Sequence, residues 1–283
     1  MKIVVFDLDE TLGCFAEVGM FWEALEHFLA TKATPVPLVP LVPPVPLAQN
    51  DTTFFAMLDL FPGFLRPHIL TILAYLLERR TEKQCQQLMI YTNNQGPPQW
   101  VKLISAYFTY KLGVKVFDQI IAAFKVHGQV VEVGRSRHEK CLDDLIKCTQ
   151  VPRNTEICFL DDQYHALMEH DNVFYITVKP YYFSLPFNEM ALTYYQAQQL
   201  AQQTLQHQPL AQQQPLAQQQ PLGPLTNFLA KMHAYTSRFK FDVLPKAAAE
   251  QEVDTIVSKK ILSYLEEFFQ KRPLRSKRTT QRK

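Results

Sequence analysis

The sequence lacks the features that would place it in a membrane or in a disulfide-rich class. It has no run of eighteen apolar residues, so we expect no transmembrane helix. Its N-terminal segment has the pattern of a buried strand and not of a signal peptide. The five cysteines are an odd number without CxxC spacing, which favours free thiols in a reducing compartment over a disulfide framework or a zinc site. We therefore expect an intracellular protein, cytoplasmic or nuclear, with no membrane partner.

Net charge is also small. The 283 residues carry a formal net charge of +2, while hydrophobic residues make up 47% of the chain and aromatic residues 12%, which is enough for a substantial core. The charge is uneven, because residues 271–283 contain seven Lys or Arg and no acidic residue. This basic tail resembles a nuclear localisation signal, read by an import receptor, or a patch that contacts nucleic acid. A solvated chain terminus explains the same composition equally well.

The N-terminal stretch combines a buried strand with acidic residues. Ile3–Phe6 is a run of four apolar residues, as expected for a parallel strand that is buried on both faces. Asp7 and Asp9 follow it directly. Ligands of open α/β sheets bind beyond the carboxyl ends of the strands, so two carboxylates at this position indicate a cation that offsets their repulsion. Mg2+ fits best, because it prefers oxygen ligands.

Polar residues also follow two later predicted strands. Leu88–Tyr91 precedes Thr92 and Asn93, where a hydroxyl and backbone donors can hold phosphate oxygens. Thr155–Leu160 precedes the pair Asp161–Asp162. The other predicted strands are Val114–Phe117 or Ile120–Phe124, a hairpin within Val126–Val133, and Val173–Val178. Apolar periodicity predicts helices at Val18–Leu29, Ile69–Arg79, Trp100–Leu112, Cys141–Cys148, Pro224–Phe239 and Glu252–Phe269.

Together these segments resemble the haloacid dehalogenase superfamily of phosphatases. Residues 7–12, DLDETL, are similar to its first motif, DxDxT, and the fuller form is typical of the carboxy-terminal-domain phosphatase-like branch, which acts on phosphorylated protein tails. Thr92 resembles the second motif, and Asp161–Asp162 resembles the acidic pair of the fourth. The motifs occur in the expected order between residue 3 and about residue 178, and their joint occurrence is far more specific than any one of them.

Lys140 is the residue that best matches the third motif. The superfamily places a lysine just before or at the start of the helix that leads to the last catalytic strand, and Lys140 directly precedes the helix predicted at Cys141–Cys148. Lys147 and Lys125 are rivals. The first lies far along that helix and the second lies far upstream of it.

The sequence departs from the pattern of the branch at two points. The family has an RPG-like segment before its second strand, whereas here Arg66-Pro67 is followed by His68. The fourth motif often has Asp-Asn followed by Ser-Pro, whereas here Asp162 is followed by Gln163-Tyr164. These departures weaken the assignment to the protein-phosphatase branch and leave the metal-binding chemistry intact.

The resemblance implies catalysis through a covalent intermediate. Asp7 is then the nucleophile, which forms an aspartyl-phosphate. Asp9 protonates the leaving oxygen and later takes a proton from the hydrolysing water. Thr92 and Lys140 hold the transferred phosphoryl oxygens.

The resemblance also implies the binding groups. It assigns Mg2+ to Asp7, to the backbone carbonyl of Asp9, and to one or both residues of the pair Asp161–Asp162. Thr11 and Asn93 are expected to bind substrate. Because Asp9 is the second aspartate of the first motif, it argues for a phosphatase over a dehalogenase.

Two segments have low complexity. Residues 34–50 contain proline at nearly every second or third position, which indicates an extended insertion, either a stiff linker or a ligand for an aromatic-lined groove on a partner. Residues 196–223 include a near-exact six-residue repeat of Gln, Pro and Leu without aromatic residues or charge, which indicates a linker or a fraying helix.

We therefore expect an α/β fold with a Rossmann-like, doubly wound parallel sheet over residues 1–185 and no large cap. A helical segment over residues 224–270 would pack on this domain or on a partner. A site without a lid admits a macromolecular chain, so the expected substrate is phosphoserine or phosphothreonine in a protein. The alternatives are a phosphatase of a small phosphate ester or of a nucleic-acid end, and a phosphatase-like binding module.

Overall fold

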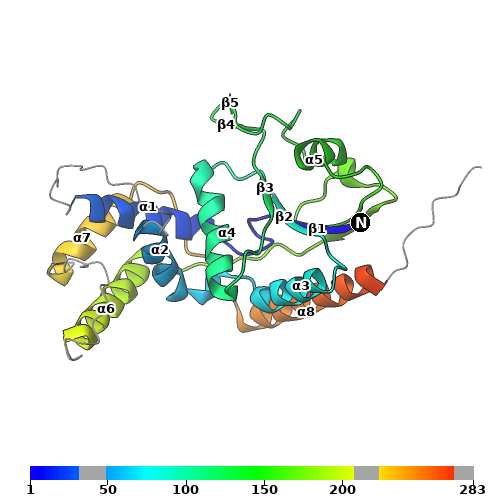
Figure 1. Ribbon diagram of the computed structural model, residues 1–283. Coiled ribbons are helices and arrows are strands. Elements are labelled where there is room, and N and C mark those ends of the chain that lie inside the picture. The colour runs from blue at the N-terminus through cyan, green and yellow to red at the C-terminus, as the bar shows by residue number, and fades with distance from the viewer. Residues whose placement is uncertain (32–48, 207–222, 271–283) are drawn as a thin grey trace, which may run out of the picture. The chain divides into compact units, whose positions relative to one another are not determined.

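The computed structural model describes residues 1–31, 49–206 and 223–270 (Figure 1). Most of the proline-rich segment predicted at residues 34–50, the repeat within residues 207–222 and the basic tail at residues 271–283 lie outside the described residues. Clustering of contacts divides the chain into two compact units, which are described separately. Of the described residues, the sheet unit comprises 1–12, 66–181 and 249–270, and the helical unit comprises those within 13–65 and 182–248.

The sheet unit is built on five parallel strands in the order β3-β2-β1-β6-β7. This confirms the predicted α/β fold with a parallel sheet. The strands are β1 (Lys2–Phe6), β2 (Gln87–Tyr91), β3 (Gln119–Ile121), β6 (Glu156–Asp161) and β7 (Val173–Thr177). From β1 the chain first adds β2 and β3 on one side and then β6 and β7 on the other. The strand order therefore reverses between β1 and β6, and such a switch point is where open α/β sheets bind ligands.

Both faces of the sheet are buried, which explains the continuous apolar runs of the central strands. Ile3 and Val5 of β1 face one way and contribute to a core that includes Leu145, while Val4 and Phe6 face the other way. All four β1 side chains are at most 1% exposed. Two-sided burial of this kind requires helices on each face.

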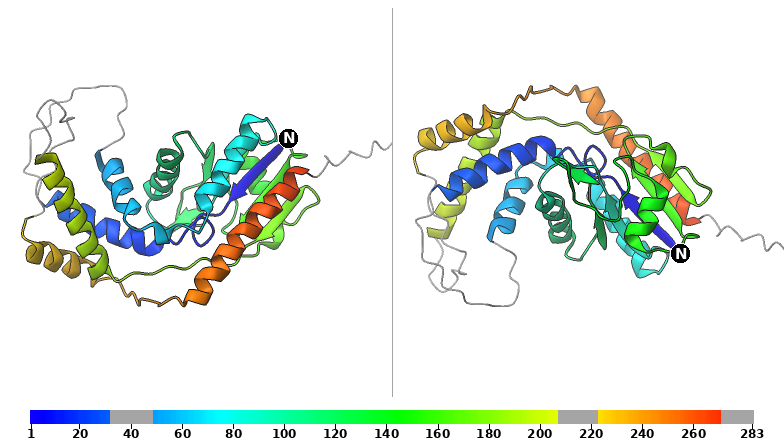
Figure 2. Two further views of the ribbon diagram at one scale, coloured as in Figure 1. Left: turned by 90° about the horizontal axis from the view of Figure 1, so that it is seen from below. Right: turned by 90° about the horizontal axis from the view of Figure 1, so that it is seen from above.

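Helices supply that cover. Helix α5 (Leu142–Thr149) lies on the face of Ile3 and Val5, and α3 (Ile69–Thr81) and α8 (Ala248–Gln270) lie on the opposite side of the sheet (Figure 1). Helix α4 (Pro98–Leu112) reaches the second face through edge-to-face rings that run from Phe108 through Phe117 to Phe6. Seen from below, α3 and α8 flank β1 (Figure 2).

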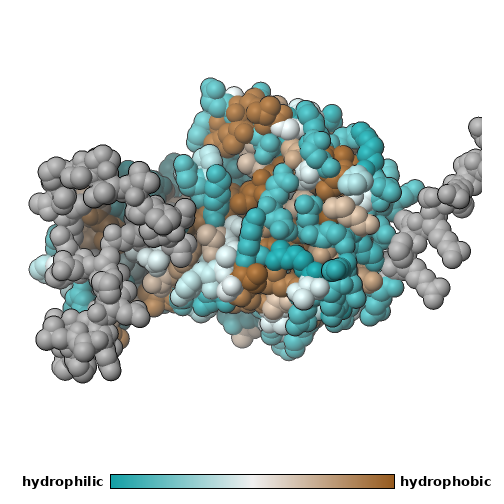
Figure 3. Space-filling view, viewed as in Figure 1, coloured by the Kyte–Doolittle hydropathy of each residue, from teal (hydrophilic) through white to brown (hydrophobic). Residues whose placement is uncertain are grey.

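The last helix is part of the sheet unit. Phe268 of α8 is 3% exposed and stacks on Phe174 of β7. The ammonium group of Lys2 donates to the Phe268 carbonyl and lies 4.9 Å from the Phe268 ring centroid. The outer surface of α3 and α8 is largely hydrophilic (Figure 3). Of the two interpretations, packing on the domain is therefore the one that the structure shows.

A short hairpin extends from the carboxyl edge of the sheet beyond β3. It is formed by β4 (Lys125–Val126) and β5 (Gln129–Val130), somewhat shorter than the hairpin predicted within residues 126–133. Val130 is 51% exposed and Val133 is 80% exposed, and hydrophobic residues gather over this region in Figure 3.

The helical unit contains elements from two distant parts of the chain. Its core is rich in aromatic residues, including an edge-to-face pair of Trp22 with Phe54 and one of Phe28 with Phe228. Its elements are α1 (Ala16–Ala30), α2 (Gln49–Asp59), the 3-10 turn η1 (Pro62–Phe64), α6 (Phe187–Gln206) and α7 (Leu225–Thr236). No helix among the described residues is long and apolar enough to cross a membrane.

This division differs from the predicted boundaries. The sequence predicts one domain over residues 1–185, whereas residues 13–65 belong to the helical unit and α8 belongs to the sheet unit. The segment over 196–223, predicted to be a linker or a fraying helix, is helical up to Gln206 as the end of α6, whose first part buries Met190 and Tyr194.

Candidate active site

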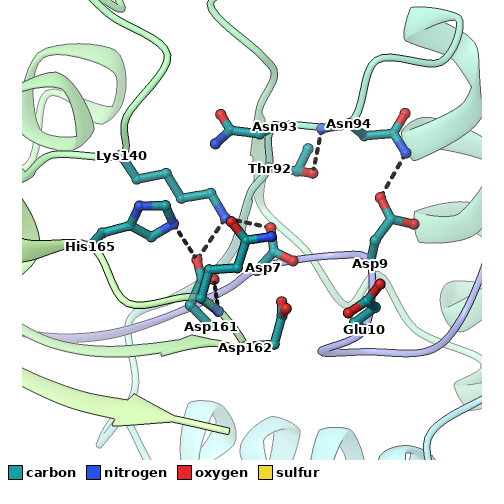
Figure 4. Close-up of a pocket in the computed structure, with 11 residues that line it drawn as sticks. Asp7, Asp9, Glu10, Thr92, Asn93, Asn94, Lys140, Asp161, Asp162 and His165 are labelled. Carbon is teal, nitrogen blue, oxygen red and sulfur yellow. Dashed lines mark hydrogen bonds and ion pairs between the residues drawn. The ribbon is translucent and has the colours of Figure 1, made fainter. Parts of the chain in front are cut away.

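A cavity of about 160 Å3 lies at the carboxyl edge of the sheet, at the switch point between β1 and β6. Its walls come from the residues that follow β1, β2 and β6 and from the segment before α5 (Figure 4). Every lining residue has a polar or charged side chain, and the residues are Asp7, Asp9, Glu10, Thr92, Asn93, Asn94, Lys140, Asp161, Asp162, Gln163 and His165. All of these residues belong to the sheet unit.

Lys140 joins the two carboxylates at the base of the cavity. Its Nζ donates to Oδ1 of Asp7 and to Oδ2 of Asp161, the latter at 2.7 Å. Lys140 and Asp161 are each 1% exposed, and Asp7 is 7% exposed. The lysine stem lies against Tyr91 and Phe159, with Nζ 5.8 and 5.9 Å from the ring centroids. These contacts hold a cation between two buried anions, and such buried ion pairs are common at functional sites.

Burial and the neighbouring charges shift the pKa values of all three groups. Burial and the charge of Asp161 raise the pKa of Asp7 to about 7, although Lys140 opposes the shift. Burial also raises the pKa of Asp161, but hydrogen bonds from His165 and Lys140 and the lysine charge outweigh it and bring this pKa below its usual value. Burial favours a lower pKa for Lys140, but the two carboxylates outweigh burial and raise this pKa above its usual value. The site thus holds more carboxylate than one ammonium group can neutralise.

A third carboxylate lies close to this pair. Asp7, Asp161 and Asp162 each offer an oxygen atom, and these atoms lie within 4.8 Å of one another. Ligand oxygens of one octahedral Mg2+ ion are about 2.9 Å apart when adjacent and about 4.2 Å apart when opposite, so the three carboxylates would move closer together to share one ion. With Lys140 included, the three carboxylates leave a formal charge of −2, which a divalent cation would cancel. The residues present therefore fit Mg2+ in both donor chemistry and charge.

Thr11 holds the third carboxylate and does not line the cavity. Thr11 is 2% exposed, and its hydroxyl donates to Oδ1 of Asp162 at 3.3 Å and accepts the backbone N–H of Asp162 at 3.1 Å. Thr11 thus holds Asp162 from outside the set of lining residues, and its role in binding substrate stays a prediction.

The loop after β2 faces the loop after β1. The hydroxyl oxygen of Thr92 accepts the backbone N–H of Asn94 at 3.0 Å, so its own hydrogen can point elsewhere. The side-chain amide of Asn94 donates to Oδ2 of Asp9 at 2.7 Å. Asn93 also lines the cavity, and its buried Oδ1 has no hydrogen-bond partner among the described residues.

Two buried arginines fix the loops that carry these groups. Arg66 is 1% exposed and donates to the backbone carbonyls of Thr11, Glu10 and Lys179, which ties down the loop after β1. Arg135 is 2% exposed and donates to the carbonyl of Thr92 at 3.1 Å and to that of His138 at 2.6 Å. One guanidinium thus connects the end of β2 to the segment that carries Lys140.

The structure brings most of the predicted site residues together. Asp7, Asp9, Thr92, Asn93, Lys140 and the pair Asp161–Asp162 all line one cavity. The two alternative lysines, Lys147 and Lys125, do not line this cavity.

Sequence reasoning missed several groups. The motifs do not include His165, but His165 lines the cavity, with its Nε2 3.4 Å from Oδ2 of Asp161. The position of His165, four residues after Asp161 and just beyond the strand, is the one available signal. Asn94, Glu10 and Gln163 were likewise not predicted, because polar loop residues near a motif are common.

Comparisons with protein-family models, with curated proteins and with solved structures found no match for this chain. The functional interpretation therefore depends on the residues and their geometry.

Proposed function

We propose that this protein is a Mg2+-dependent phosphomonoester hydrolase that acts through an aspartyl-phosphate on Asp7. Membership of the haloacid dehalogenase superfamily, inferred from the order of its motifs, is part of the same proposal. The observation that carries it is the contact of Lys140 with both Asp7 and Asp161, in a cavity that Asp9, Thr92 and Asp162 also line. Groups that are far apart in sequence but form one polar site at a switch point support a shared chemical task.

In the first step, a carboxylate oxygen of Asp7 attacks the phosphorus atom. The bond from phosphorus to the ester oxygen breaks, and that oxygen leaves with the electron pair and takes a proton from Asp9. Asp9 suits the role of acid because burial raises its pKa, although the hydrogen bond from Asn94 opposes the shift.

In the second step, a water molecule attacks the same phosphorus atom. Its proton passes to Asp9, the bond from phosphorus to Asp7 breaks, and Asp7 recovers its carboxylate. The products are an alcohol and inorganic phosphate, and both aspartates return to their starting protonation states.

Other groups hold the phosphoryl oxygens while this happens. The ammonium group of Lys140 and the hydroxyl of Thr92 are donors fixed by their own contacts before substrate binds, and such preorganised donors stabilise charge that moves in the transition state. Asp7, Asp161 and Asp162 would hold Mg2+, and a bound divalent ion screens the repulsion between the carboxylates and an anionic substrate.

The size of the cavity favours a phosphoprotein as substrate. Pockets for small molecules usually have volumes of about 300–1,000 Å3, whereas this cavity has about 160 Å3. It can enclose a phosphoryl group but not the whole of a nucleotide or a sugar phosphate. The exposed apolar hairpin at the same edge of the sheet offers a surface for a peptide, since such patches mark interaction sites.

The first experiment compares hydrolysis of p-nitrophenyl phosphate with Mg2+ and with a chelator. We expect Mg2+-dependent turnover that falls by several orders of magnitude in Asp7→Asn. Asp143→Asn is the matched control, because the Asp143 side chain is 79% exposed and lies outside the cavity. A protein without Mg2+-dependent turnover, or an Asp7→Asn variant as active as the control, would contradict the proposal and leave a phosphatase-like binding module.

A second comparison tests the substrate class. We expect phosphoserine and phosphothreonine peptides to be hydrolysed with a higher kcat/KM than sugar phosphates, nucleotides or oligonucleotides with terminal phosphates. Turnover of small esters or nucleic-acid ends alone would support the proposed reaction and contradict the proposed protein substrate.

A further inference from the structure

The contacts of Asn94 identify a group that acts on the proposed acid of the reaction. This inference rests on the proposed function, because it concerns the oxygen of Asp9 from which the proton is delivered. Asn94 lies two residues after Thr92, in the loop that follows β2, and its side chain points towards Asp9 (Figure 4). It was not among the residues that the motifs singled out.

The orientation of the Asn94 amide is fixed by chemistry. Its Oδ1 accepts the backbone N–H of Gly96 at 2.8 Å. A backbone N–H can only donate, so the side-chain atom that faces it must be the oxygen. The amide nitrogen then faces Asp9, 2.7 Å from Oδ2. The usual ambiguity between the oxygen and nitrogen of an asparagine side chain does not arise here.

This orientation makes the two oxygens of Asp9 unequal. An amide N–H2 group can only donate, so Oδ2 of Asp9 must act as an acceptor towards Asn94. In a protonated carboxyl group the carbonyl oxygen is a stronger acceptor than the hydroxyl oxygen. The bond from Asn94 therefore favours the carbonyl at Oδ2 and the transferable proton at Oδ1.

Gly96 is part of the same arrangement. A Cβ atom placed at residue 96 would lie 2.9 Å from Oδ1 of Asn94, closer than real Cβ contacts normally come. Glycine thus lets the backbone approach the amide closely enough to hold it. The backbone N–H of Gly96 and the side chain of Asn94 together direct the amide nitrogen at Asp9.

We propose that Asn94, held by Gly96, is a positioning residue that keeps Oδ2 of Asp9 as an acceptor and so directs the transferable proton to Oδ1, from which the leaving group takes it. In the first step the proton leaves Oδ1 as the ester bond breaks. In the second step the attacking water returns a proton to Oδ1 as the bond from phosphorus to Asp7 breaks. Asn94 itself neither gains nor loses a proton in either step.

Leaving-group dependence tests this role. Phenyl phosphate releases a phenolate as basic as a tyrosine side chain, with a pKa of about 10, and needs protonation as it leaves. p-Nitrophenyl phosphate releases a much weaker base, which needs little. We expect Asn94→Leu to lower kcat/KM for phenyl phosphate at least about tenfold more than for p-nitrophenyl phosphate, since general acids contribute about 10²–10⁴-fold.

Two further variants sharpen the test. Gly96→Ala should show the same preference in a weaker form, because its Cβ displaces the amide without removing it. In an Asp9→Asn background no transferable proton remains, so adding Asn94→Leu should change the rate on phenyl phosphate by less than about twofold. Gln99→Leu makes the same change from amide to leucine at an exposed nearby position and should affect neither substrate.

The outcomes separate this proposal from the proposed function. An equal loss on both substrates in Asn94→Leu and Gly96→Ala, or a full additional loss in the Asp9→Asn background, would show that Asn94 is only structural. A wild-type protein that hydrolyses neither ester would instead refute the phosphatase function. Circular dichroism spectra of each variant, together with unfolding midpoints, identify any variant that does not fold. If Asn94→Leu does not fold, Gly96→Ala decides the question.

Discussion

Lys140 donates to two buried carboxylates, so its removal would leave them facing each other without a cation. We expect Lys140→Met to lower the free energy of unfolding by roughly 3–5 kcal/mol at neutral pH without divalent metal, as is typical when one partner of a buried ion pair is lost. Lys147→Met is the matched control, because Lys147 is exposed on α5, and it should change stability by less than about 0.5 kcal/mol. Urea unfolding measures both, and equal losses would show that the buried lysine has no special role.

The raised pKa of Asp7 predicts a pH dependence of stability in the absence of metal. The pKa of Asp7 is about 7 in the folded protein, whereas the ordinary value of 3.8 applies to the unfolded chain. Between pH 3.8 and pH 7 the folded state therefore binds more protons than the unfolded state. Stability should therefore fall as pH rises from about 4 to 7, by on the order of 2–4 kcal/mol from this group, and then level off.

Asp7→Asn isolates that contribution. Urea unfolding in a chelating buffer at pH 5 and pH 7.5 should show a smaller loss of stability with rising pH in Asp7→Asn than in the wild-type protein. Unchanged slopes in the two proteins would mean that Asp7 is ionised across this range.

At the scale of elements, α8 completes the second face of the sheet. Phe268→Ala should cost about 3–5 kcal/mol, because the ring is buried against Phe174 and beneath the ammonium group of Lys2. Tyr264→Ala, on the same helix but 36% exposed, should cost less than about 1 kcal/mol. If urea unfolding gives similar small values for both, α8 does not contribute to the core of the sheet unit.

Elements with strong local patterns were predicted well from the sequence. Apolar runs predicted β1, β2, β6 and β7 to within about a residue at each end, and amphipathic periodicity predicted α3 and α8. The third strand was ambiguous because two apolar runs are adjacent, and the structure selects Gln119–Ile121 from the second. No helix was predicted for Phe187–Tyr195, and the segment from residue 196 was predicted to be a linker or a fraying helix, since its Gln-rich sequence shows little apolar periodicity.

Local backbone geometry explains one departure from the expected motif. His68, which stands where the family pattern has glycine, has φ of +59°, in the left-handed region that glycine favours. The backbone thus keeps a glycine-like conformation with a histidine side chain, just before α3 begins at Ile69. Residue types alone do not reveal this conformation, so His68 counts as a departure from the RPG-like segment when only the sequence is compared.

At the scale of the whole chain, the sequence predicted the carboxylates of the site but not the division into units. Strand ends of a parallel sheet meet at one edge by topology alone, so Asp7 and Asp161–Asp162 could be predicted to converge. The helical unit depends instead on rings from distant segments, such as Phe28 and Phe228, and no local pattern links residues 13–65 to residues 182–248. Asn94 and His165 were not predicted, because the directions of their side chains cannot be inferred from a strand pattern.

Because every lining residue of the cavity belongs to the sheet unit, Mg2+ should stabilise that unit locally. We expect hydrogen exchange in 10 mM Mg2+, relative to a chelating buffer, to slow at residues 7–10 and 161–165, by about 100-fold if the concentration is about 100 times Kd. Elements of the helical unit far from these loops in sequence, such as α7, provide the internal reference. Asp162→Asn should reduce the protection, because it removes one of the three carboxylates, whereas Asp143→Asn should retain it. Exchange at both loops that is insensitive to Mg2+ in the wild-type protein would exclude the metal site and, with it, the charge balance on which the proposed mechanism depends.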